Sequence, residues 1–181
     1  MSASTGSAAT PAERIRTAFE RNAKAVGLRP SIGQGTAVTR VRLRDGLTCD
    51  IRDGAWRLTA DMSEKYGGNR AGPDPGVFGR AGLGSCLAAG YAMWAARRGV
   101  PIDELTVEIH ADYDARGELG VDDTVRPAYS EVRIVVEVKS PASEAEVTAV
   151  LEEAERHSPW LQVFREPVSV AREARIVSSG A

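Results

Sequence analysis

The segment from Asp74 to Gly99 constrains the fold more than any other part of this 181-residue chain. Asp74 followed by Pro75 is typical of a helix N-cap and first helical residue, and Gly99 follows two arginines as a C-terminal stop. A helix over 75–98 would be about 36 Å long, enough to cross a domain of this size. Its abundance of glycine and alanine predicts a buried central helix that other backbones approach closely.

The spacing of apolar and polar residues in the flanking segments predicts the remaining elements. Before the central helix, we expect a helix over 11–26 that ends at Gly27, then three antiparallel strands within 36–61 with turns at Asp45-Gly46 and Asp53-Gly54, and a loop over 63–75. After it, we expect strands over 104–113 and 130–139 and a helix over 145–156 that opens with the capping box Ser143 and Glu146. A short turn after Pro159 and a last strand over 168–176 complete the chain. This order predicts an α+β fold in which antiparallel sheets pack on two central helices.

Length and composition indicate one main domain. With 43% hydrophobic residues, the chain can bury a core without disulfides or structural metal. We expect a disordered tail at 1–10, an N-terminal helix and linker at 11–35, the main domain at 36–176 and a second tail at 177–181.

Charge and hydropathy exclude several classes of protein. The net charge is −2 and the basic residues are dispersed along the sequence, so we expect neither nucleic acid nor membrane as a partner. The most apolar stretch, 81–96, is too short to span a bilayer. Because the N-terminal residues also lack the features of a secretory signal, a cytoplasmic location is the default expectation.

Cys86 has the best claim to chemistry. Neither Cys49 nor Cys86 belongs to a cluster with metal-ligand spacing, so we expect no metal and no cofactor. Cys86 lies about three turns into the central helix, where the helix dipole no longer stabilises a thiolate. It is therefore either an inert core residue or a nucleophile activated by a cation from another element. Cys49 alternates on a strand and is expected in the core.

Several side chains could supply that cation. The candidates from other elements are Arg44, Arg57, Arg70 and His157. Arg80 is a poorer candidate, because it lies about 120° around the same helix from Cys86. His157 has a second interpretation as a residue that interacts with the C-terminal dipole of the preceding helix.

Four short motifs, in this order and spacing, resemble the OsmC/Ohr family (osmotically inducible protein C and organic hydroperoxide resistance protein). They are Tyr66-Gly67-Gly68, Gly72-Pro73-Asp74-Pro75, Gly84-Ser85-Cys86 and His157-Ser158-Pro159. The resemblance covers residues 36–176, with the N-terminal helix as an extension. It implies an OsmC-like domain that forms an intertwined homodimer, with the central helices back to back and active sites at the subunit interface.

The resemblance also implies a role for Cys86. Members of the family reduce hydroperoxides with a cysteine that corresponds to Cys86, and Arg44 in Arg44-Asp45-Gly46 matches an arginine that would stabilise its thiolate. The family's resolving cysteine is replaced here by Ser158, which cannot form a disulfide. A glutamate that holds the arginine in the hydroperoxide-resistance branch is replaced by Gly76.

Two functions remain open from the sequence. The first is a thiol-dependent hydroperoxide reductase that uses Cys86 and Arg44, with an external thiol reductant as the resolving partner. The second is a non-catalytic homodimer that binds a small apolar ligand in an interface pocket. The candidate pocket residues are His157, Trp160, Phe164 and Phe78.

Overall fold

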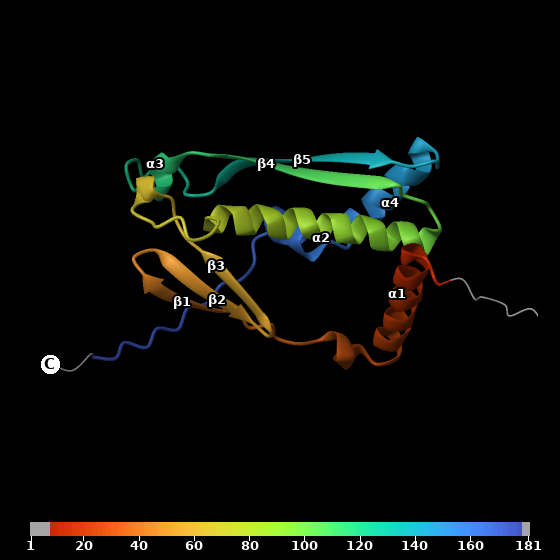
Figure 1. Cartoon of the computed structure of the whole chain (residues 1–181), viewed down its shortest axis with the longest axis horizontal. Coiled ribbons are helices and arrows are strands. Elements are labelled where there is room, and N and C mark those ends of the chain that lie inside the picture. Colours follow the sequence, from red (N-terminus) through yellow and green to blue (C-terminus); the bar gives the residue numbers. More distant parts are fainter. Residues whose placement is uncertain (1–7, 179–181) are drawn as a thin grey trace, which may run out of the picture.

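The long helix α2 (Pro75–Arg98) runs through the middle of the chain, with the other elements arranged around it (Figure 1). The structure is a computed structural model and describes residues 8–178. The Asp74 carboxylate accepts a hydrogen bond from the backbone N of Val77 at 3.0 Å, and Gly99 ends the helix with a φ of 70°. Both predicted ends of the central helix are confirmed.

The remaining elements complete an α+β architecture, as predicted. They are α1 (Pro11–Leu28), the 3₁₀ helices η1 (Pro30–Gly33) and η2 (Glu64–Tyr66), β1 (Arg40–Asp45), β2 (Thr48–Asp53), β3 (Trp56–Ala60), β4 (Glu104–Tyr113), α3 (Ala115–Glu118), β5 (Tyr129–Lys139), α4 (Glu144–Arg156) and α5 (Pro159–Arg165). Strands β1, β2 and β3 form one antiparallel sheet, and β4 and β5 form another.

The core lies along one side of α2. Leu83, Leu87, Tyr91 and Ala95 recur at a spacing of four residues and are all buried. The first three of them pack with Ala154 of α4 and Leu161 of α5 and against partly buried side chains of β4 and β5. Helix α2 thus contacts β4 as well as α4 and α5, and the two-stranded sheet runs along it (Figure 1).

The buried Tyr91 makes one polar contact within this core. Its hydroxyl donates a hydrogen bond to Glu155 Oε1 at 3.1 Å, which joins α2 to α4. Burial and the nearby Glu155 carboxylate raise the pKa of Tyr91, so its hydroxyl stays protonated and keeps this bond at physiological pH.

Small residues on α2 admit bulky side chains. A Cβ added at Gly84 would lie 3.3 Å from Ile109 Cγ1 on β4, and one added at Gly82 would lie 3.5 Å from Trp160 Cε2 on α5. The predicted close approach to this helix therefore occurs, but at these positions the approaching atoms belong to side chains.

The three-stranded sheet has two chemically different faces. Its register places Val41 opposite Ile51 and Ile51 opposite Leu58, so these side chains share an apolar face. Val41 and Leu58 are 59% and 47% exposed, so part of this face is left open in the described chain, whereas Ala60 at the end of β3 is buried. The sheet lies to one side of α2 (Figure 1).

The opposite face of the same sheet is rich in arginine. Strand alternation and register bring together Arg40, Arg42, Arg44, Arg52 and Arg57, with Asp50 among them. The basic residues of this segment, which look dispersed along the sequence, are therefore gathered by the fold.

Three predicted boundaries need correction. The segment 168–176 is not a strand, because residues 167–178 make no backbone ladder with any described strand. The turn predicted after Pro159 is the helix α5, which Ser158 caps. Gly27 does not end α1, which runs one residue further; its C-cap is Arg29, and Pro30 disfavours continued helix there.

The predicted tails fall partly outside the described residues. Residues 1–7 and 179–181 lie outside them, and residues 177 and 178 belong to no helix or strand. Thr10, which was assigned to the N-terminal tail, is instead the N-cap of α1. Its side chain accepts a hydrogen bond from Glu13 N at 3.2 Å, and Glu13 Oε2 accepts one from Thr10 N at 2.7 Å.

Candidate functional site

Cys86 and Ser158 meet at the contact between α2 and α5. The sulfur of Cys86 lies 3.5 Å from Ser158 Oγ. Among residues 8–178, this hydroxyl makes the only hydrogen-bond contact with Cys86 Sγ. Cys86 as a whole is partly buried. The structure therefore brings together the two positions that the family resemblance pairs.

Ser158 is held firmly in place by its role at the start of α5. Its side chain is the N-cap of this helix, and its Oγ accepts a hydrogen bond from Leu161 N at 3.3 Å. Ser158 is only 4% exposed and is followed by Pro159, which suits the first helical position. Local sequence thus fixes the hydroxyl that faces Cys86.

Two of the four pocket candidates lie on the same side of the molecule. Trp160 packs beside Gly82, one turn before Cys86 on α2. Its ring centroid is 6.5 Å from that of Phe164. Phe78 is half-buried two turns before Cys86, and none of the ring contacts within residues 8–178 joins it to this pair.

His157 takes part in a different cluster. Its ring stacks on Trp94 with centroids 4.9 Å apart, and its Nε2 lies 3.3 Å from Glu153 Oε1. It is also the C-cap residue of α4, which matches its interpretation as a helix-end residue. The structure therefore places His157 beside Trp94 and not in contact with Cys86.

The candidate arginines also have other neighbours within the chain. Arg44 pairs with Asp50 at 3.4 Å, and Arg57 donates to the backbone oxygens of Gly54 and Trp56. Arg70 is exposed. Within residues 8–178, no guanidinium contacts the Cys86 sulfur.

Gly76 lies close to the side chains of Arg80 and Asp74. Arg80 Nη1 donates to the Tyr129 hydroxyl at 3.1 Å, which joins α2 to β5. A Cβ added at Gly76 would lie 3.0 Å from this Nη1 and 2.9 Å from Asp74 Oδ1. The position of a Cβ at residue 76 is therefore close to the side chains of Arg80 and Asp74.

A buried polar cluster around Asp61, which no sequence motif predicts, lies between β3 and α2. Asp61 Oδ2 accepts hydrogen bonds from Thr48 Oγ1 and from the backbone N of Asn69 and Ala71, and its Oδ1 accepts one from Met62 N. These contacts fix the loop between β3 and α2. The one signal in the sequence was an acidic residue at the end of an alternating strand, just before a glycine-rich loop.

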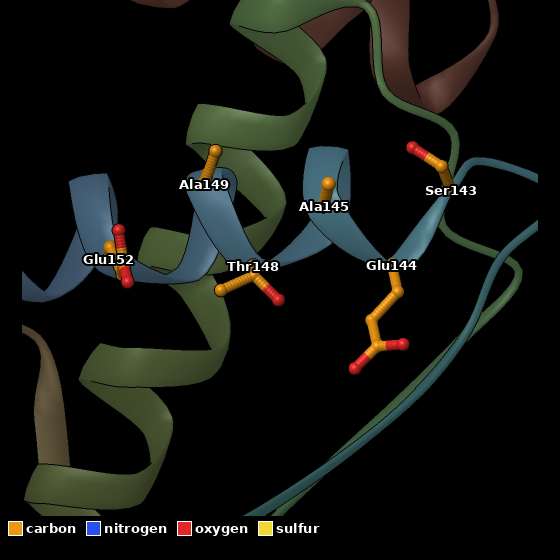
Figure 2. Close-up of a pocket in the computed structure, with 6 residues that line it drawn as sticks. All are labelled: Ser143, Glu144, Ala145, Thr148, Ala149 and Glu152. Atoms are coloured by element: carbon orange, nitrogen blue, oxygen red, sulfur yellow. The ribbon is translucent and has the colours of Figure 1, made fainter.

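Two surface hollows lie away from Cys86. One, of roughly 640 Å³, is on the outer side of α4 and is shown in Figure 2; it is lined by Ser143, Glu144, Ala145, Thr148, Ala149 and Glu152. The other lies on β2 and β3. Neither includes Cys86 or the four pocket candidates. Within residues 8–178, no cluster of three or more His, Cys, Asp or Glu side chains could hold a metal ion.

The family model described as OsmC-like protein matches residues 67–173, which is more than half of the chain. The chain belongs to the OsmC-like protein family. The match includes Cys86 and Ser158, whereas Arg44 lies outside the matched residues. No curated protein matches the chain.

Solved structures share this OsmC-like fold. The OsmC-like protein from Mycoplasma pneumoniae is 16% identical with a TM-score of 0.63, over 74% of this chain and 90% of that one. An organic hydroperoxide resistance protein OsmC from Legionella pneumophila is 15% identical with a TM-score of 0.55, over 72% and 90%. One from Elizabethkingia anophelis is 14% identical with a TM-score of 0.56, over 74% and 91%. At these identities the likeness concerns the fold alone.

In the described part of the chain, no helix combines the length and the apolar character that crossing a bilayer requires.

Proposed function

We propose that this protein reduces organic hydroperoxides with the thiol of Cys86 and that an external thiol returns it to its starting state. The observation that carries the proposal is the contact between the sulfur of the partly buried Cys86 and the hydroxyl of the buried Ser158, 3.5 Å apart. Two of the similar structures are named organic hydroperoxide resistance proteins, which supports the substrate class.

The reaction begins with the thiolate of Cys86. Its sulfur attacks the terminal oxygen of the hydroperoxide, the O–O bond breaks, and Cys86 becomes a sulfenic acid. The alkoxide that leaves takes a proton from water and departs as an alcohol. Sulfur is thereby oxidised by two electrons and the peroxide is reduced by two.

An external thiol completes the cycle because the chain offers no second thiol at this site. Cys49 lies on β2, where its only side-chain hydrogen-bond contact within the described residues is the Leu47 carbonyl oxygen. An external thiol condenses with the sulfenic acid to form a mixed disulfide and water. A second thiol then releases Cys86 and leaves as the external disulfide. A reducing cytoplasm would supply such thiols.

The proposed active form is a homodimer. The apolar face of the β1–β3 sheet and the exposed positions Ala81, Ser85 and Ala89 on α2 are suited to a second copy. Dimerisation would bring the cation that a single chain does not supply to Cys86, with Arg44 as the first candidate.

The alternative is a non-catalytic dimer that binds a small apolar ligand beside Trp160 and Phe164. The observation that favours it is the absence of a guanidinium at Cys86 within residues 8–178. Without a cation, a half-buried thiol is a weak nucleophile.

Hydroperoxide consumption in excess dithiol separates the two functions. We expect the parent protein and Cys49→Ser to consume an organic hydroperoxide at similar rates, and Cys86→Ser to fall to the rate of the dithiol alone. If all three proteins match the dithiol blank, the enzyme proposal fails. Retained binding of an apolar fluorescent probe by all three would then favour the ligand-binding dimer.

A further inference from the structure

The groups around Ser158 Oγ determine the direction of its hydrogen bond to Cys86. A serine hydroxyl has one hydrogen to donate and two lone pairs that accept. Leu161 N donates to Oγ at 3.3 Å, which occupies one lone pair. Among the described residues, Cys86 Sγ is the only atom within hydrogen-bond distance that could accept the hydroxyl hydrogen. Once Cys86 has lost its proton, the bond between them can run only from Ser158 to sulfur.

The burial of Ser158 makes this bond hard to replace. With 4% exposure, its hydroxyl has little access to water that could serve as another partner. Hydrogen bonds to a charged acceptor are roughly twice as strong as those between neutral groups, and they strengthen where water is excluded. A donor in this position therefore favours the charged form of the sulfur over the neutral thiol.

We propose that Ser158 donates a hydrogen bond to the Cys86 sulfur that stabilises its thiolate, and that it replaces the resolving function of this position with an activating one. This inference rests on the proposed function and adds a residue to its mechanism. Ser158 keeps its own proton throughout, since it only donates a hydrogen bond. A hydroxyl forms no disulfide, so the sulfenic acid of Cys86 is left for the external thiol.

A test of this role must separate the hydroxyl from the helix cap. Ser158→Ala removes both functions of the side chain. Ser158→Gly also removes the hydroxyl but leaves a residue that is tolerated at an N-cap. Ser143→Ala is the matched control, because Ser143 caps α4 in the same way, with its Oγ accepting from Glu146 N, and makes no contact with Cys86.

The readout is alkylation of Cys86 by iodoacetamide, followed by peptide mass spectrometry over a range of pH. This reaction needs thiolate but no hydroperoxide. We expect Ser158→Ala and Ser158→Gly to slow alkylation of Cys86 about tenfold at neutral pH, and to shift the rate profile toward higher pH by about one unit. Ser143→Ala should stay within about twofold of the parent.

The outcomes are distinguishable from those of the hydroperoxide assay. If both Ser158 variants alkylate at the parent rate, or if Ser143→Ala slows alkylation equally, the proposed hydrogen bond is refuted. If the Ser158 variants slow alkylation in a protein that consumes no hydroperoxide, the hydrogen bond stands and the peroxidase proposal fails.

Discussion

Thr48 donates a hydrogen bond to Asp61 through its hydroxyl, with 2.8 Å between Thr48 Oγ1 and Asp61 Oδ2, and both residues are only 2% exposed. The Asp61 carboxylate has no cation beside it in the described chain, and its charge is balanced by donors alone. The backbone N–H groups of Asn69 and Ala71 point to the same oxygen from either side of Arg70. Arg70 has a φ of 56°, which is unusual for a residue with a side chain. Asp61 thus holds the loop that leads into α2.

This cluster predicts an acid-sensitive fold. Burial acts to raise the pKa of Asp61, but the hydrogen bonds from Ala71 N, Thr48, Met62 N and Asn69 N outweigh it, so the pKa is lowered from 3.8. A lowered folded-state pKa gives stability that is present above pH 3.8 and is lost as the pH falls below it. We expect the urea midpoint to drop below this pH in the parent.

Asp61→Asn is the matched variant for this prediction. Its amide would turn a donor toward at least one of the N–H groups that the carboxylate accepts, so the urea midpoint at neutral pH should fall. The decrease of the urea midpoint on acidification should also be smaller in this variant than in the parent. An equal loss in both proteins would show that other carboxylates control the acid response.

Gly72 provides a test of the loop packing. A Cβ at this position would overlap the backbone carbonyl oxygen of Thr59, which cannot move without disrupting β3. We expect Gly72→Ala to lower the free energy of unfolding by about 2 kcal/mol. Gly27→Ala is the control, since a Cβ there meets nothing within 4 Å and lies in a helix; it should be neutral or gain about 0.5 kcal/mol. Similar losses in both variants would contradict the packing argument.

Local signals were sufficient to predict most elements of this fold. Asp74-Pro75 and Gly99 marked α2 at both ends, and the turns at Gly46 and Gly54, with φ of 53° and 51°, joined the strands as expected. The prediction that failed is the last strand over 168–176. A strand also needs a partner, and residues within one sequence segment do not reveal whether that partner is present.

Ser158→Cys should restore an internal disulfide. The present 3.5 Å between Cys86 Sγ and Ser158 Oγ is close enough that a small shift would bring two sulfurs to bonding distance, about 2.05 Å. We expect one equivalent of hydroperoxide to convert the variant to a Cys86–residue 158 disulfide with release of water. Peptide mapping without reductant would detect it. A variant in which Cys86 and the new cysteine at position 158 both stay free thiols under these conditions would show that the positions do not align.

The homodimer is tested at the exposed side of α2. Ala89→Arg places a long charged side chain where a second copy is proposed to pack, so it should convert the dimer to a monomer. Ala145→Arg adds the same side chain at an exposed position of α4 and should leave the dimer intact. Light scattering after size exclusion measures both. A monomeric parent protein would contradict the proposal directly.

The candidate site was less predictable than the fold. Cys86 and Ser158 are far apart in sequence, and only the family resemblance suggested that they would meet. The neighbours of Arg44 and His157 depend on strand register and on the stacking of Trp94, neither of which a motif encodes. The Asp61 cluster depends on backbone groups of a loop, so the identities of its residues give little indication of it.

The most direct test of the account is to trap the oxidised form of Cys86. The protein would be treated with one equivalent of an organic hydroperoxide in the presence of dimedone, which labels sulfenic acids, and its peptides would then be analysed by mass spectrometry. The account predicts a dimedone adduct on Cys86 that forms faster than any on Cys49. Equal labelling of both cysteines, or no adduct on Cys86, would contradict it.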